Sequence, residues 1–161
     1  DAEEEYGPFN SEKMAKTFEV VDGGIAPVST KFWFYDFYNA TKANITKLDT
    51  SSLTNVRYMF SDCSRLTTVG DISGWDVSNV TNMSGMFSMF SKYGYSASSL
   101  TTVGDLSGWD VSNVTDMSAM FYGCSRLTTV GDISGWDVSN VWNHDNFNNN
   151  APSVIAPKWV A

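Results

Sequence analysis

Strong basic character is missing from this chain, and histidine and cysteine, which supply many catalytic and metal-binding side chains, are scarce. Ten lysines and arginines stand against 18 aspartates and glutamates, and the net charge of −8 argues against nucleic acid or anionic lipid as a partner. His144 is the only histidine, which excludes a zinc site made of several histidines. No Gly-rich phosphate loop or glycosidase signature is present. We therefore expect no catalytic site, no cofactor and no bound metal.

Cysteine is also scarce, and long apolar segments are missing. Cys63 and Cys124 hold the same place in the pattern described below but lie two repeats apart, a separation of about 10 Å that exceeds disulfide reach. We expect two buried free thiols. No run of residues has the length and apolarity of a transmembrane helix, so no membrane insertion is predicted. The chain begins at Asp1 rather than Met, which fits a mature secreted protein or a trimmed chain.

What the chain does contain is a repeat. Segments almost identical to DISGWDVSNV stand at residues 71–80, 105–114 and 132–141. The period is 27 residues between the last two segments and 34 between the first two, because seven residues are inserted within residues 89–98. A repeat of this length indicates stacked coils, since no single coil of this size can bury its apolar side alone.

Equivalent residues of stacked coils form columns, with neighbours about 4.8 Å apart. A column of Phe60, Phe87 and Phe121 would give a continuous core. The LTTVG and Asn-Val-Thr segments favour short parallel strands, whereas residues 118–126 lack β-branching and favour a helical turn. The predicted fold is an α/β repeat solenoid, a leucine-rich-repeat-like right-handed stack of about four coils with short parallel strands, capped at both ends.

The pattern divides the chain into three regions. Residues 1–36 form the expected N-terminal cap region and include the aromatic run that ends in Phe34-Tyr35. Residues 37–147 hold the repeats, with Phe37 in the first, irregular coil at the position that Phe121 has later. Residues 148–161 form the expected C-terminal cap or tail, because the exposed ends of a stack must be covered.

One long motif recurs in residues 48–87 and 100–141. It combines MF-x-x-C-S-x-L-T-x-V with LSGWD-x-SNVT-x-M-x-x-MF and resembles the BspA-like leucine-rich repeats of bacterial surface proteins, also described as the DUF285 repeat. The resemblance implies a leucine-rich-repeat type of solenoid on a secreted or surface-anchored protein. It also implies a role in adhesion to host proteins or in co-aggregation.

Two columns of aspartates carry the acidic charge. The first either binds calcium through its carboxylates or accepts backbone N–H groups in Asx-turns, and the Asp-Val-Ser-Asn sequence favours the turns. Its members are Asp49, Asp76, Asp110 and Asp137. The second is expected to face solvent, where an acidic stripe would steer a basic partner. Its members are Asp71, Asp105 and Asp132.

Tryptophan and threonine columns also have two interpretations each. Trp75, Trp109 and Trp136 form either an exposed platform for sugar rings and partner side chains or a buried ladder, and burial is favoured because three exposed tryptophans would make a costly patch. The stacked threonines could instead form an ice-binding face. Thr67 and Thr68 are adjacent, however, and adjacent strand residues point to opposite faces, which disfavours it.

The insertion is the best local candidate for a ligand site, because it interrupts a strict pattern with Phe90, Lys92, Tyr93 and Tyr95. Insertions in repeat proteins are either binding loops or neutral, and both interpretations stay open. The main functional hypothesis is a monomeric, secreted or cell-surface binding module that adheres to an extracellular protein or glycan of a host or neighbouring cell. The alternative is a structural spacer or stalk of a longer surface protein, with binding elsewhere.

Overall fold

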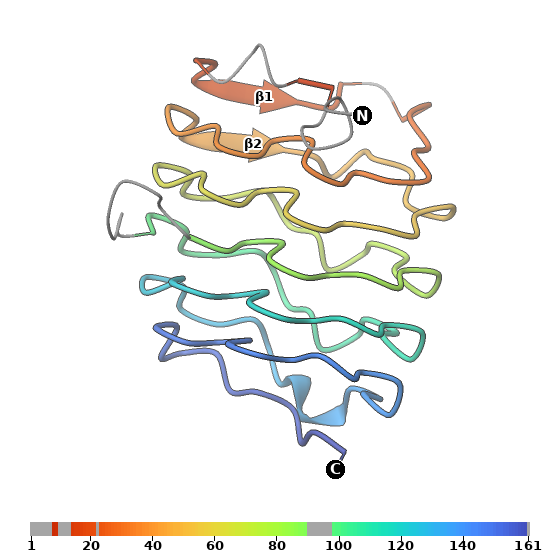
Figure 1. Cartoon of the computed structure of the whole chain (residues 1–161). Coiled ribbons are helices and arrows are strands. Elements are labelled where there is room, and N and C mark those ends of the chain that lie inside the picture. The colour runs from red at the N-terminus through yellow and green to blue at the C-terminus, as the bar shows by residue number, and fades with distance from the viewer. Residues whose placement is uncertain (1–7, 10–13, 22, 90–97, 161) are drawn as a thin grey trace, which may run out of the picture.

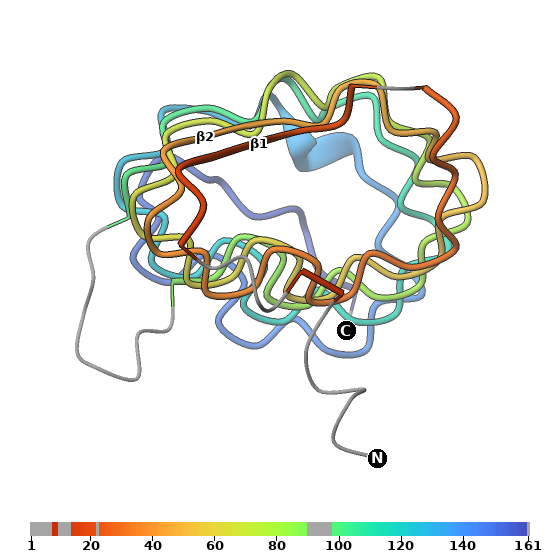
Figure 2. The ribbon, with the colours of Figure 1, turned by 90° about the horizontal axis from the view of Figure 1, so that it is seen from above.

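The computed structural model describes residues 8–9, 14–21, 23–89 and 98–160. Along this part of the chain, successive coils lie one upon another from the N-terminal to the C-terminal end (Figure 1). Viewed along the stack, the coils superimpose around a shared interior (Figure 2). The register is defined by parallel bridges between neighbouring coils. These bridges join, in order, Ser29, Asn55, Asn82, Asp116 and Asn143.

The predicted α/β class is wrong. The described residues form one sheet, in which the parallel strands β1 (Thr17–Glu19) and β2 (Lys42–Asn44) pair, and one short 3₁₀ helix, η3 (Ile133–Gly135). The leucine-rich-repeat-like solenoid of about four coils with short strands and helical turns is thus not what this chain forms. Turns interrupt each coil and reduce the other strand pairing to isolated bridges. Across the described part of the chain there is no helix with the length and apolar character needed to cross a bilayer.

Overlapping turns take the place of the expected helical turn at residues 118–126 and at the equivalent segments of other coils. In one such segment the N–H of Tyr58 donates to the carbonyl oxygen of Ser84 in the next coil, at 2.9 Å. The N–H of Met59 instead donates within its own coil, to the carbonyl oxygen of Val56 at 3.2 Å. The backbone is left-handed at Tyr58, with φ of 52°. A helix requires φ of about −63° at every residue, so the alternation prevents one from forming.

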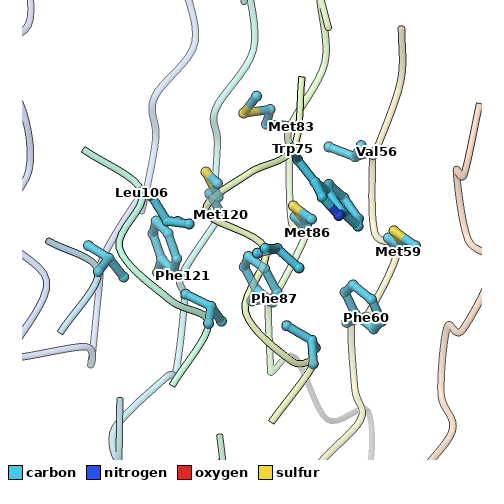
Figure 3. Close-up of a cluster of buried hydrophobic side chains, with 14 of the residues drawn as sticks. Val56, Met59, Phe60, Trp75, Met83, Met86, Phe87, Leu106, Met120 and Phe121 are labelled. Atoms are coloured by element: carbon cyan, nitrogen blue, oxygen red, sulfur yellow. The ribbon is translucent and has the colours of Figure 1, made fainter. Parts of the chain in front are cut away.

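The predicted phenylalanine column is confirmed. Phe60, Phe87 and Phe121 stack with ring centroids 5.8 and 5.7 Å apart and planes within 12° of parallel. No ring is more than 1% exposed. Figure 3 shows these rings in a row, with one methionine of each coil beside them. The core therefore runs continuously through the stack and belongs to no single coil.

The phenylalanine column begins earlier in the chain than predicted. Phe34, rather than Phe37, stacks on Phe60, with centroids 5.5 Å apart and planes 13° apart. The N–H of Phe34 also donates to the carbonyl oxygen of Met59 at 2.9 Å, as the register of later coils requires. The sequence obscures this register because the aromatic run at residues 32–38 offers several rings and lacks the Met-Phe pair of the repeat.

Replacing Phe87 with alanine tests whether this column holds the coils together. We expect the free energy of unfolding to fall by about 3–5 kcal/mol, because a cavity opens between two rings that cannot close upon each other. Urea denaturation measures the change. Ile155→Ala is the control, since Ile155 is 80% exposed and its loss should change stability by less than about 0.5 kcal/mol. A loss below about 1 kcal/mol for Phe87→Ala would contradict a continuous core.

Candidate functional site

The predicted acidic column lies at the surface, and the backbone holds its carboxylates in place. The Oδ1 atoms of Asp71 and Asp105 accept the N–H of the serine two residues later, at 3.0 and 2.9 Å. Asp132 does the same at the start of η3, at 3.0 Å. No Cβ would fit on Gly104 against the carboxylate of Asp71. The carboxylate therefore lies along the stack, directly against the next coil.

The other aspartate column forms the Asx-turns that its sequence favours. Each carboxylate accepts the N–H of the serine two residues later, at 3.0–3.1 Å. Three of the serine hydroxyls donate to the same oxygens at 2.6–2.7 Å. The aspartates concerned are Asp49, Asp76, Asp110 and Asp137. Among the described residues, no group of three or more His, Cys, Asp or Glu side chains is placed to hold a metal ion.

Hydrogen bonds outweigh the repulsion between stacked carboxylates. The hydroxyl and N–H of Ser78 lower the pKa of Asp76, although the charge of Asp110 acts in the opposite direction. The N–H and hydroxyl of Ser107 likewise lower the pKa of Asp105 against the charges of its column neighbours. These carboxylates are exposed, so water and salt screen the repulsion between them. Both columns therefore stay ionised at neutral pH and form acidic stripes.

A third polar column was not predicted from the sequence. The Oδ1 atoms of Asn82 and Asp116 accept the N–H of the serine two residues later at 3.0 and 2.9 Å, and its hydroxyl at 2.7 Å. Asn55 accepts the N–H of Arg57 at 2.9 Å, and Asn143 accepts that of Asp145 at 3.3 Å. The sequence does carry the signal, because Asn-Met-Ser and Asp-Met-Ser have the same spacing as Asp-Val-Ser.

The tryptophan column is buried, so the interpretation as an exposed platform is wrong. Trp75, Trp109 and Trp136 are at most 6% exposed. The rings of Trp109 and Trp136 are within 3° of parallel, with centroids 6.4 Å apart. Their indole N–H groups donate to the carbonyl oxygens of Ile72 and Leu106, at 3.2 and 3.0 Å. These rings fill the core and present no face to a ligand.

The two cysteines are buried free thiols, as predicted. The Sγ atoms of Cys63 and Cys124 donate to the carbonyl oxygens of Phe34 and Phe87, at 3.0 and 3.2 Å. Burial raises the pKa of both thiols, that of Cys124 to about 12. Both therefore stay protonated at neutral pH, where a thiol is a poor nucleophile.

The predicted binding loop lies outside the described residues. This applies to all four of its candidate side chains, Phe90, Lys92, Tyr93 and Tyr95. Met89 and Ser98 flank that segment, and both are buried, at 4% and 0% exposure. Of the predicted site residues, the structure therefore places only the three aspartates of the solvent-facing column.

A hollow in the surface of the first coils brings together residues that the sequence does not connect. Its volume is about 360 Å³, and it is lined by Phe32, Tyr35, Tyr58, Ser61 and Asp62. The rings of Phe32 and Tyr58 come from successive coils and lie 20° from parallel, with centroids 5.3 Å apart. Tyr35 meets Phe32 edge-on, with centroids 5.5 Å apart and planes 85° apart. All three rings are half-buried.

The hollow exists because the first coils depart from the repeat. Phe32 and Tyr58 occupy the column position that Gly85 and Ala119 occupy in later coils, two residues before the stacked phenylalanine. The backbone is left-handed at all four, with φ between 52° and 61°. The ring of Tyr58 lies so close over Gly85 that no Cβ would fit there. The ring of Tyr58 thus needs the space that Gly85 leaves in the next coil.

Acid titration tests the hydrogen bonds of the aspartate columns. Their pKa values are lower in the folded chain than the ordinary value, so the folded state binds fewer protons than the unfolded state. Stability is then fully present above about pH 5 and is lost as the pH falls below about 4. Urea denaturation across this range measures the loss, which Asp110→Asn should reduce. Greater stability in acid would mean that repulsion between carboxylates dominates.

The fit between Tyr58 and Gly85 is tested by a double-mutant cycle. We expect Gly85→Ala to lower the free energy of unfolding by about 1–2 kcal/mol, because the new methyl group displaces the ring and strains a left-handed residue. In a Tyr58→Ala background the ring is gone, and only the backbone strain should remain. Thermal or urea denaturation gives the coupling between the two sites. If the two substitutions lower the free energy of unfolding additively, the ring of Tyr58 does not contact Gly85 and the predicted fit is wrong.

Comparison with known proteins supports the resemblance seen in the repeats. The chain matches the family described as "Mycoplasma protein of unknown function, DUF285" over residues 29–157. No curated protein and no solved structure gives a significant match. The matched region includes the aspartate columns, the phenylalanine column from Phe34 onward, and the hollow. Because the match spans well over half of its residues, the chain belongs to the DUF285 family.

Proposed function

We propose that this chain is a secreted or cell-surface binding module, and that the hollow lined by Phe32, Tyr35, Tyr58, Ser61 and Asp62 is its ligand site. One observation carries the proposal: large aromatic side chains occupy left-handed backbone positions that the scaffold fills elsewhere with glycine or alanine. The ligand belongs to the surface of a host or neighbouring cell, as the resemblance to bacterial surface repeats implies.

Equivalent positions of successive coils share a left-handed backbone but carry different side chains. A bulky residue with positive φ is an outlier, because its Cβ lies too close to the following carbonyl oxygen at a cost of about 1–2 kcal/mol. Phe32 and Tyr58 have φ of 58° and 52°. Gly85 meets the same need without strain, so the fold alone does not call for an aromatic residue there. Strain that the scaffold does not require is typical of functional sites.

Burial separates these rings from the core. Phe34 and Phe60 are 6% and 1% exposed and belong to the stacked column. Phe32 and Tyr58, two residues earlier in each coil, are only half-buried and line the hollow. Part of each ring is therefore exposed in the hollow, whereas the rings of the core column are covered. Aromatic residues in this situation are the usual anchors of binding sites.

The acidic stripes have a supporting role in the proposal. The aspartates that form them hold turns of the scaffold, and their exposed charge adds to the net charge of −8. A field of one sign speeds the approach of a basic partner surface without setting which ligand binds. Specificity is therefore assigned to the hollow and not to the stripes.

Cell binding tests the proposal. The labelled chain should bind intact host or bacterial cells, and Tyr58→Ala should weaken that binding at least about tenfold, since an aromatic side chain that the ligand covers typically contributes more than 1.4 kcal/mol. Flow cytometry measures the titration. Trp142→Ala is the matched control, because Trp142 is a 74% exposed aromatic residue outside the hollow and its loss should leave binding unchanged.

Two results would overturn the proposal. Binding to no cell surface would favour the alternative, a spacer or stalk that presents other domains. Equal binding by the wild-type chain and Tyr58→Ala, with both folded by circular dichroism, would remove the hollow as the ligand site.

A further inference from the structure

We propose that copies of this chain associate head to tail, with the last coil of one copy placed against the first coil of the next. The contact joins residues 142–146 of one copy to residues 28–31 of its neighbour. It does not depend on the hollow that is proposed as the ligand site. Three observations lead to it: where apolar side chains are exposed, which backbone groups lack a partner, and how charge is distributed between the two ends.

Large apolar side chains are exposed only near the two ends of the stack. Among the described residues, those that are exposed fall within residues 9–38 or 142–160, which lie at opposite ends (Figure 1). They are Phe9, Met14, Val21, Ile25, Val28, Tyr38, Trp142, Ile155 and Val160. The end coils of a repeat protein need a polar outer surface if they face water. The two ends of this stack therefore favour contact with another protein surface.

Val28 and Trp142 are the end members of one column. The N–H of Thr54 donates to the carbonyl oxygen of Val28 at 2.8 Å, and the N–H of Trp142 donates to that of Thr115 at 3.0 Å. Threonine holds this position in the coils between them, as Thr54, Thr81 and Thr115. Val28 is 62% exposed and Trp142 is 74% exposed. Only the two end coils thus carry an apolar residue here, and a head-to-tail contact would cover both.

Backbone groups beside this column lack partners at both ends. Within the stack, N–H and carbonyl groups of this wall pair with those of the neighbouring coil. At the ends, three N–H groups and three carbonyl groups of the described residues have no such partner. They are the N–H groups of Val28, His144 and Asn146, which in the register of the stack would meet the carbonyl groups of Trp142, Ser29 and Lys31 of the next copy. Unpaired edges of this kind are templates for another chain.

The charges of the two ends are complementary. Lys31 and Asp145 are the end members of a second column, which holds Arg57, Ser84 and Ser118 in the coils between. Residues 14–60 contain five Lys and Arg against four Asp and Glu, whereas residues 101–150 contain one against six. A head-to-tail contact places Asp145 beside Lys31 of the next copy. Contact between two C-terminal ends would instead bring like charges together, so a second copy in head-to-tail orientation is the favoured occupant.

Aromatic rings already cover the core at each end, so the contact is small. Phe9 stacks on Phe34 with centroids 5.5 Å apart, and Trp159 stacks on His144 with centroids 4.3 Å apart. A single copy therefore needs no partner to bury its core. Small interfaces give weak complexes, and we expect association only above about 10 μM. At the lower concentrations of a cell-binding titration the chain is then a monomer.

Sedimentation velocity of the intact chain tests the association. The mean mass should rise steadily between about 10 μM and about 1 mM without a plateau at the dimer, because a head-to-tail contact leaves both outer ends open. Trp142→Thr, which restores the residue of the column, should weaken association at least about tenfold and leave the melting temperature unchanged. A monomer at every concentration, a plateau at the dimer, or equal association of Trp142→Thr would overturn the proposal.

Exchanging the two end charges tests the orientation. Lys31→Asp and Asp145→Lys should each weaken association about threefold, and the double variant should restore it, because opposite charges meet again. Arg65→Asp is the matched control, since Arg65 is an exposed cation of a middle coil and its reversal should have no effect. Association that the double variant does not restore would contradict the head-to-tail orientation.

Cysteine variants test the register. Lys31→Cys mixed with Asp145→Cys should form a disulfide-linked dimer under mild oxidation, because neighbours in a column lie within disulfide reach. Neither variant should cross-link alone, and the native thiols are buried. Cross-linking of one variant with itself would show contact between like ends and overturn the proposal. Tyr58→Ala should associate as the wild-type chain does, so failure of this contact and failure of the ligand site are distinguishable.

Discussion

Alternating backbone hydrogen bonds hold this chain in its stacked form, and the other features depend on them. From Val56 to Asp62, every second N–H group donates to the next coil. The N–H groups of Met59 and Ser61 donate to carbonyl oxygens three residues earlier, and that of Arg57 donates to the Asn55 side chain. All backbone N–H groups of the segment are thus satisfied without a helix or an extended strand. The alternation places left-handed residues at the same position in each coil. The side chain at that position must fit both a positive φ and the neighbouring coil.

The polar columns serve the same arrangement. Aspartate and asparagine side chains accept N–H groups where the backbone turns, and threonines reach the preceding coil, as when the Thr67 hydroxyl donates to the carbonyl oxygen of Thr41 at 2.8 Å. Repetition of these residues is explained by the scaffold, because each column repeats one bond in every coil. Departures from the repeat are not explained in that way. Phe32 and Tyr58 are such a departure, and the hollow that they help to line is where a ligand site is proposed.

The sequence predicts the parts of this structure that depend on spacing alone. Columns of Phe60 and Trp109 follow from the period, and the turns at Asp110 follow from the Asp-Val-Ser pattern. The fold class does not follow, because the stacked turns require a left-handed backbone at residues such as Ala119, with φ of 52°. Alanine gives no signal for a left-handed backbone.

The hollow is invisible to the sequence for a related reason. Its rings are 26 residues apart, since Phe32 and Tyr58 meet only through the register of the coils. The sequence also misplaces that register, because the repeat pattern aligns Phe37 with the core column whereas Phe34 stacks on Phe60. The room for Tyr58 comes from Gly85 in a third coil. A site assembled from single residues of several coils becomes evident only once the coils are superimposed.

Amide hydrogen exchange followed by NMR tests the alternation of bonds most directly. The account predicts strong protection of Tyr58 and Phe60, whose N–H groups donate to the next coil, and of Met59, whose N–H donates within its own coil. Both sets should exchange only through cooperative opening of the stack, since each coil is held by its neighbours. Fast exchange at Tyr58 and Phe60 with protection of Met59 alone would show isolated turns without bonds between coils, and would contradict the account.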